Sequence, residues 1–144
     1  FSFGKNVQGQ LGLSHADNVI IPQSIPNLSR IISLSCGEHF TVCADENGGV
    51  YSFGRNNSGQ LGLGNTLSQQ TPQKIPGMPR ISSVHCGGEH TFCIDREQTA
   101  WSFGLNSSGQ LALGRTQCPT WSPQQVFCHS IQKISCGYDF TIIQ

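Results

Sequence analysis

A 50-residue repeat constrains the fold of this chain more than any other feature of its sequence. The tripeptide Ser-Phe-Gly at residues 2–4 recurs at 52–54 and at 102–104. At this offset the 144 residues align without a gap as units 1–50, 51–100 and 101–144. Twelve positions are the same in all three units, and in the first they are Ser2, Phe3, Gly4, Asn6, Gly9, Gln10, Leu11, Leu13, Ile31, Cys36, Gly37 and Thr41. Such a period predicts a tandem array of one supersecondary unit, so we treat 1–144 as one domain.

Each unit has the residue pattern of short β-strands. In the second unit, apolar and β-branched runs at 80–86, 91–94 and 100–103 are separated by Gly-Gly at 87–88 and by a polar turn at 95–98. Stripes of apolar residues with helical spacing do not occur in the units. Short strands separated by Gly, Asn and Pro predict an all-β fold. About four strands per unit is the size of a β-propeller blade.

The repeated Asn-x-x-Gly-Gln-Leu motif predicts a structural loop. An asparagine such as Asn56 can cap its own turn, and Gly59 can adopt a positive φ. Gln60 is expected to hydrogen-bond loop backbone that would otherwise be buried without a partner. We assign to architecture, and not to chemistry, the repeated residues Gly4, Asn6, Gly9, Gln10, Leu11, Gly54, Asn56, Gly59, Gln60, Leu61, Gly104, Asn106, Gly109, Gln110, Leu111, Cys36, Cys86 and Cys136.

The motif Ser-Phe-Gly-x-Asn-x-x-Gly-Gln-Leu-Gly-Leu-Gly, followed by Pro and by Ile-x-x-Val-x-Cys-Gly-Gly-x-His-Thr, is matched best at residues 51–94. This pattern resembles the regulator of chromosome condensation repeat over essentially the whole chain. The resemblance implies a seven-bladed β-propeller of four-stranded antiparallel blades, of which this chain holds about three. It also implies a use in protein interaction, as an exchange factor for the small GTPase Ran or as a substrate-recruiting part of HECT-type ubiquitin ligases.

An arc of three blades leaves one apolar face uncovered at each end, because a blade buries both of its faces against neighbours. Apolar surface that stays exposed at the two ends does not contribute the burial free energy that a domain needs for its stability. We therefore expect further repeats or other subunits to complete the arc. Two copies of the chain would give about six blades, but the sequence does not select this arrangement.

Seven cysteines are present, an odd number that excludes complete pairing within the chain. Five of them occupy repeat positions in apolar runs, which predicts buried free thiols and a reducing compartment, cytoplasmic or nuclear. A metal-stabilised module is the alternative, suggested by Cys36 with His39, Cys86 with His90 and Cys136 with Asp139. Structural zinc needs four converging ligands, whereas the spacing of these pairs shifts and the third lacks histidine. We predict no metal and no cofactor.

The turn that follows each Cys-Gly pair carries the candidate partner-binding residues. According to the resemblance, the positions that face the GTPase in the family's exchange factor correspond here to His39, Phe40, Glu89, His90, Asp139 and Phe140. The alternative is that His90 bonds within its own turn while the phenylalanines pack into the blade. Trp121, in the Pro-punctuated segment 115–123, is either an exposed binding contact or a cover for the open end of the last blade.

Composition excludes several classes of function. Eight basic and eight acidic residues give no net charge, and a nucleic-acid binder usually carries a basic stripe. No apolar run approaches the roughly 20 residues that span a bilayer, and no catalytic motif is present. We predict a non-enzymatic scaffold that presents blade loops to a protein partner, without nucleic acid or membrane. The alternatives are the GTPase exchange factor and the ubiquitin-ligase module, although these units contain no insertion for the protruding wedge that the resemblance associates with exchange.

Overall fold

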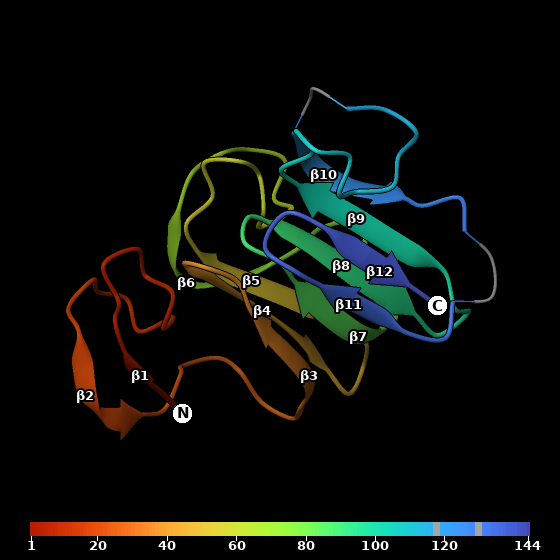
Figure 1. Cartoon of the computed structure of the whole chain (residues 1–144). Coiled ribbons are helices and arrows are strands. Elements are labelled where there is room, and N and C mark those ends of the chain that lie inside the picture. Colours follow the sequence, from red (N-terminus) through yellow and green to blue (C-terminus); the bar gives the residue numbers. More distant parts are fainter. Residues whose placement is uncertain (117–118, 129–130) are drawn as a thin grey trace.

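The computed structural model describes residues 1–116, 119–128 and 131–144, and its regular elements are all strands (Figure 1). In chain order these are β1 (Ser2–Gly4), β2 (Val19–Gln23), β3 (Ile31–Cys36), β4 (Phe40–Asp45), β5 (Val50–Gly54), β6 (Gln69–Lys74), β7 (Ile81–Cys86), β8 (His90–Asp95), β9 (Ala100–Gly104), β10 (Thr120–Gln125), β11 (Ile134–Cys136) and β12 (Thr141–Ile143). No helix within the described ranges has the length and hydropathy to cross a membrane.

The strands form two whole blades between two half-blades. The first blade is the sheet β3-β4-β5-β6, the second blade is β7-β8-β9-β10, and neighbouring strands in both are antiparallel. The N-terminal half-blade is β1-β2 and the C-terminal half-blade is β11-β12. The predicted all-β design with four-stranded antiparallel sheets is confirmed. Each whole blade takes its first two strands from the end of one sequence unit and its last two strands from the next, apart from Val50 and Ala100 at the starts of β5 and β9.

The hydrophobic core lies between successive sheets. β7 packs against β3 and β4 of the first blade, and β11 packs against β7 of the second. The largest cluster combines side chains of both whole blades, among them Phe40, Val42, Ile81, Val84 and Phe103. A second cluster joins the second blade to the C-terminal half-blade. Stability therefore depends on contacts between blades, as in other repeat proteins.

The Asn-x-x-Gly-Gln-Leu loops have the structural role that the sequence predicts. Asn56 is fully buried; its Oδ1 accepts a hydrogen bond from Leu61 N (3.0 Å) and its Nδ2 donates to Asn65 O (2.9 Å). The Gln60 Oε1 accepts from Ser58 N at 2.9 Å. Equivalent bonds recur in the first and third units. These side chains supply the partners that buried loop backbone requires.

The gapless alignment of the units is wrong by one residue over β10. Gly54 pairs with Gln69, whereas Gly104 pairs with Thr120, one residue further along than the repeat period predicts. Pro123 therefore occupies the place of Pro72. One residue is added between β9 and β10 and one is removed before β11, because connections between strands tolerate such changes better than the strands do.

The cysteines are only partly in the environment that the sequence predicts. Cys43 and Cys93 are buried, and the six described cysteines are free, while Cys118 lies outside the described residues. Burial raises the pKa of the Cys43 thiol to about 12 and that of Cys136 to about 11. The expectation of burial is wrong for Cys36, which is exposed. Within the described ranges, the side of β3 that faces away from β7 has no strand of a preceding blade against it.

Candidate functional site

Three turns, each following the first strand of a sheet, meet at one side of the molecule. They comprise residues 37–39, 87–89 and 137–139, and we call them the turn arc. Glu38 N donates a hydrogen bond to Gly88 O (3.1 Å), and Gly88 N donates to Tyr138 O (2.9 Å). The turns surround a shallow depression of about 290 Å³. Positions 50 residues apart are thus joined by backbone hydrogen bonds into one continuous surface.

The shape of each turn comes from a ring packed on a glycine. Gly37 N donates to Phe40 O and Gly87 N donates to His90 O, both at 2.9 Å. A Cβ added to Gly37 would lie 1.9 Å from the Phe40 ring, and one added to Gly87 would lie 2.1 Å from the His90 ring. Glycine is required here because the ring occupies the space that a side chain would need.

Two of the residues predicted to contact a partner are enclosed by the fold. Phe40 and His90 are fully buried, whereas Phe140, at the same position in the third unit, is exposed. The phenylalanine packing that the sequence left as an alternative is therefore the arrangement of Phe40. His90 bonds outside its own turn, with Nε2 at 2.9 Å from Thr141 Oγ1 of the C-terminal half-blade. Buried side chains have no surface to offer, so Phe40 and His90 act on the arc only by shaping it.

Burial lowers the pKa of His90 to about 4, against the opposing effect of the Asp139 carboxylate. The imidazole is therefore neutral near pH 7. Its Nδ1 is buried without a hydrogen-bond partner among the described atoms. A neutral ring is the form that this enclosed position tolerates, because a buried charge without a partner is costly.

The remaining predicted residues lie on or beside the arc. Glu89 is half-buried; Arg55 Nη1 lies 3.1 Å from its carboxylate, and Ser58 Oγ donates to it at 2.7 Å. His39 Nε2 lies 3.7 Å from the Glu38 carboxylate, and Asp139 is exposed. The structure therefore brings His39, Glu89 and Asp139 to one face, with the charge of Glu89 already neutralised by Arg55.

Two residues of the turn arc with side chains on its surface, Glu38 and Tyr138, were not among those predicted to bind a partner. Tyr138 OH donates a hydrogen bond to Glu38 Oε2 (2.6 Å), which joins two residues 100 positions apart. This bond is the main cause of the raised pKa of Tyr138. The second unit, which matches the repeat pattern best, has Gly88 at this position and so does not indicate the pair of Tyr138 and Glu38. Comparison of all three units at this position is the signal that would have found the pair.

Trp121 lies away from the turn arc, because β10 and β7 are opposite edges of their sheet. Its side chain is 48% exposed and packs on the 56–64 loop of the first blade. A Cβ on Gly59 would lie 2.6 Å from the indole Cδ1, and Gly64 N donates to Trp121 O at 2.9 Å. Trp121 therefore covers the preceding blade, and not the open end of the last one.

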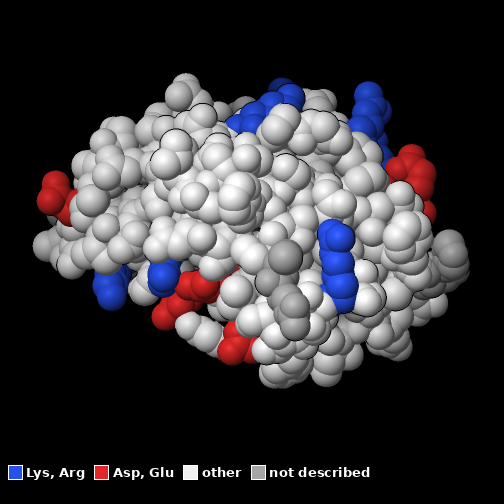
Figure 2. Space-filling model, turned by 90° about the horizontal axis from the view of Figure 1, so that it is seen from above, with Lys and Arg blue, Asp and Glu red and all other residues white. Residues whose placement is uncertain are grey.

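The surface carries few charges and no metal centre is apparent in the parts of the chain described. Across residues 1–116, 119–128 and 131–144, no three His, Cys, Asp or Glu side chains gather closely enough to hold a metal ion. Figure 2 shows that Lys, Arg, Asp and Glu side chains are scattered over a mostly uncharged face. Recognition by such a surface depends on short-range contacts more than on long-range attraction.

The model of the regulator of chromosome condensation (RCC1) repeat matches residues 1–44, 47–94 and 98–144, and a second model of this repeat matches 31–60 and 81–110. The chain belongs to the RCC1 repeat family. Among curated protein sequences, none matches this RCC1 repeat chain.

Solved structures show the fold of this RCC1 repeat chain. Prp20p from Saccharomyces cerevisiae superposes with a TM-score of 0.88 at 23% identity, covering 98% of this chain and 38% of its own. Yeast RCC1 (Prp20) bound by Kap60 superposes with a TM-score of 0.87 at 23% identity, covering 98% of this chain and 37% of its own. Human WBSCR16 superposes with a TM-score of 0.78 at 21% identity, covering 94% of this chain and 37% of its own. The chain is a partial propeller of the RCC1 type that spans less than two fifths of these proteins.

Proposed function

We propose that this chain is a non-enzymatic interaction module whose turn arc contacts a protein partner. The observation that carries the proposal is the backbone ladder from Glu38 through Gly88 to Tyr138, which fixes three turns on one face. Side chains held by such a frame lose little conformational freedom when a partner binds, and this favours affinity.

The side chains of the arc favour a partner surface with basic groups around an apolar or aromatic contact. Glu38 and Asp139 are exposed, and Tyr138 presents a ring with a polar tip. Tyrosine is enriched among the residues that dominate binding energies at interfaces. Glu89 contributes less, because Arg55 already compensates its charge.

The similar structures support protein binding as the function. The Prp20p structure was described together with the binding of Prp20p to Gsp1p and histones, and yeast RCC1 (Prp20) was solved bound to Kap60. These partners belong to those proteins, which are more than twice as long as this chain. For this chain we take from them a set of probes: a Gsp1p-type GTPase and histones.

A charge reversal on the arc tests the proposal. The double variant Glu38→Lys, Asp139→Lys is expected to weaken binding of the GTPase or histone probe by at least about tenfold, measured by calorimetric titration. The control is Glu97→Lys, the same charge change on an exposed residue in the turn at the other end of β8. If the arc variant and the control both bind like the unchanged protein, the arc is not the contact surface.

Exchange-factor activity is the second candidate, favoured by the likeness to Prp20p. A nucleotide-release assay on a panel of small GTPases separates the two. We expect binding without accelerated release, since no unit carries an inserted wedge. Accelerated release that the arc variant abolishes would establish exchange instead. The ubiquitin-ligase role stays a prediction.

We further propose that the protein works in a reducing compartment, the cytoplasm or nucleus. The free state of the six described cysteines, with Cys43 and Cys93 buried in the core, supports this assignment. Thiols in such positions persist where disulfides are kept reduced.

A further inference from the structure

Arg55, Ser58 and Glu89 meet where the loop after β5 of the first blade touches the second blade. Ser58 Oγ donates a hydrogen bond to Glu89 Oε2 (2.7 Å), and Arg55 Nη1 lies 3.1 Å from Glu89 Oε1. The carboxylate therefore bridges a serine hydroxyl and a guanidinium group. Side-chain exposure is 30% for Arg55 and 17% for Glu89, so water reaches the three groups only in part. All three belong to the two whole blades, and together they form a small site that holds one anion.

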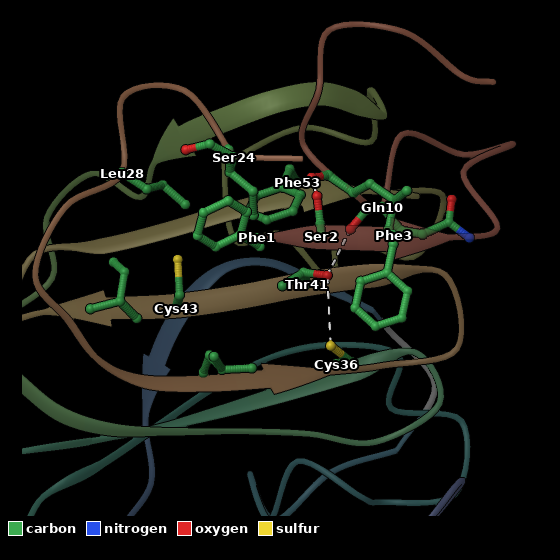
Figure 3. Close-up of a pocket in the computed structure, with 14 residues that line it drawn as sticks. Phe1, Ser2, Phe3, Gln10, Ser24, Leu28, Cys36, Thr41, Cys43 and Phe53 are labelled. Atoms are coloured by element: carbon green, nitrogen blue, oxygen red, sulfur yellow. Dashed lines mark hydrogen bonds between the residues drawn. The ribbon is translucent and has the colours of Figure 1, made fainter. Parts of the chain in front are cut away.

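Hydrogen bonds fix the loop on the second blade beside this site. Ser58 N donates to the Gln60 side chain (2.9 Å), and Gln60 O accepts from Thr91 Oγ1 of β8 (2.9 Å). Figure 3 shows the equivalent bond of the preceding junction, which Thr41 donates to Gln10 O (2.9 Å). The Ser58 hydroxyl is thus presented to the carboxylate by a loop that is anchored on the blade carrying that carboxylate.

Only the second unit combines a cation, a hydroxyl and a carboxylate at these positions. At the places of Arg55, Ser58 and Glu89, the first unit has Lys5, Gln8 and His39, and the third has Leu105, Ser108 and Asp139. The loop hydrogen bond to the glutamine side chain is nevertheless present in all three units. The architecture of the repeat therefore does not explain why the three groups occur together in the second unit.

A phosphate on Ser58 fits the place that the Glu89 carboxylate occupies. Phosphoserine carries a charge of about −1.5 to −2 at pH 7 and three acceptor oxygens. A guanidinium group binds phosphate through two parallel hydrogen bonds, which makes Arg55 a suitable partner. Phosphorylation also removes the hydroxyl proton that Ser58 donates to Glu89. The carboxylate then loses its hydrogen bond and is repelled by the new charge.

An arginine three residues before a hydroxyl is a charge pattern that many serine/threonine kinases recognise. In this chain it precedes Ser33, Ser58, Ser83 and Thr99. The first and third of these lie within the paired strands β3 and β7, whereas Ser58 lies in a surface loop beside the exposed Asn57. Such loops open locally at a low free-energy cost. Near Thr99, Arg96 is bound to Glu46 O of the first blade (2.9 Å). Of the four, Ser58 has the arginine, the loop and the anion site together.

We propose that Ser58 is a phosphorylation site and that its phosphate displaces Glu89 from Arg55. The Ser58 oxygen attacks the γ-phosphorus of ATP, the bond from this phosphorus to the leaving ADP oxygen breaks, and the hydroxyl proton passes to a base of the kinase. The phosphate pairs with Arg55, and the charge of Glu89 is no longer compensated. Because Glu89 belongs to the turn arc, the modification makes the arc more acidic. The effect of this on a partner rests on the proposed function, whereas the site itself does not.

The first experiment incubates the protein with ATP and a kinase that recognises arginine three residues before serine. Mass spectrometry of its peptides is expected to place phosphate on Ser58 and none on Ser108, which has Leu105 in place of the arginine. Arg55→Leu, which introduces the residue of the third unit, should slow incorporation at Ser58 by at least about tenfold. Circular dichroism establishes that the variant is folded. Absence of phosphate from Ser58 of the unchanged protein overturns the proposal.

The second experiment follows the phosphate of the modified protein by phosphorus NMR, in the folded and in the urea-unfolded chain. Free phosphoserine releases its second proton at about pH 6. Pairing with Arg55 favours the dianion, so the second pKa of the phosphate should be lower in the folded chain by about 0.5 or more. A carboxylate that kept its place would raise this pKa instead. An equal or higher pKa in the folded chain therefore overturns the displacement of Glu89.

The third experiment compares binding of the basic histone probe to the phosphorylated and the unmodified protein by calorimetric titration. The phosphorylated protein is expected to bind about threefold more tightly or better, and added salt should reduce the gain. Glu89→Gln, phosphorylated in the same way, should show a smaller gain. Equal affinities with the phosphate in place contradict control of the arc by Ser58. A probe that binds neither form contradicts the proposed function, and with it this control, but not the phosphate site, which the first two experiments decide without a partner.

Discussion

The junction between the two whole blades and the free edges of the half-blades contain the same residues at the same repeat positions, in opposite environments. Phe103 is enclosed by the loop of the first blade, where a Cβ on Gly62 would lie 2.8 Å from its ring. Phe3 has the same neighbours in sequence, Ser and Gly, and is largely exposed. Whether a repeated side chain is buried in this protein therefore depends on the presence of a neighbouring blade, and not on the repeat sequence alone.

The largest effect is expected from removal of an enclosed ring. Phe103→Ala should lower the free energy of unfolding by about 3–5 kcal/mol, because it leaves a cavity between the blades. Phe3→Ala should change it by less than about 0.5 kcal/mol, since the ring is exposed. Urea unfolding at protein concentrations where the chain is monomeric measures both. Equal losses would show that Phe3 is enclosed in solution.

The stability of the protein should depend on pH through the enclosed His90, whereas Phe40 and Phe140 at the same position of the other units carry no titrating group. The folded pKa of His90, about 4, lies below the ordinary value of 6.5, so the unfolded chain binds more protons between these values. Stability is therefore complete above about pH 6.5 and falls as the pH drops toward 4, by up to about 3 kcal/mol. Burial lowers the pKa of His85 as well, which adds a fall in the same direction.

The variant His90→Phe isolates the contribution of His90, because Phe40 shows that this ring fits the same place. It loses the bond to Thr141 but should retain only the part of the pH dependence that His85 and the carboxylates cause. Urea unfolding of both proteins between pH 4 and pH 7.5 gives the difference. Parallel pH profiles for the two proteins would mean that His90 titrates normally.

Substitution of a glycine by alanine should cost more unfolding free energy where the ring packed on that glycine is fixed than where the ring can move. A Cβ on Gly87 would meet the buried His90 ring and lie 2.5 Å from Gly137 O, neither of which can move freely. Gly87→Ala is expected to cost about 1–3 kcal/mol of unfolding free energy. Gly137→Ala should cost clearly less, because the ring above it is Phe140, which is exposed and free to rotate away. Thermal and urea unfolding compare the two, and a Gly137→Ala cost as large as that of Gly87→Ala would contradict this account.

The repeat predicted the strands, the loop motif and the blade type, because all three depend on residues within one unit. The roles of Asn56 and Gln60 follow from local hydrogen bonding and are visible in the sequence. What the sequence did not show depends on contacts between units. Cys36 is exposed and Phe40 buried although both stand at repeat positions, since one faces a free edge and the other a neighbouring blade. The Tyr138 to Glu38 bond joins units 100 residues apart, which no local pattern indicates.

The smallest expected change in unfolding free energy comes from removing single serine hydroxyls at the blade junctions. Ser33 Oγ accepts a hydrogen bond from Val84 N (3.1 Å), so a side chain of the first blade satisfies the backbone of the second. The equivalent Ser83 contacts His85 Nε2 (3.2 Å) in its own strand. Ser33→Ala should therefore cost about 1 kcal/mol of unfolding free energy, because Val84 N is left without an acceptor, and Ser83→Ala should cost about half of that or less. If urea unfolding gives the opposite order, the serine bonds do not join the blades, and packing between β3 and β7 alone holds the junction.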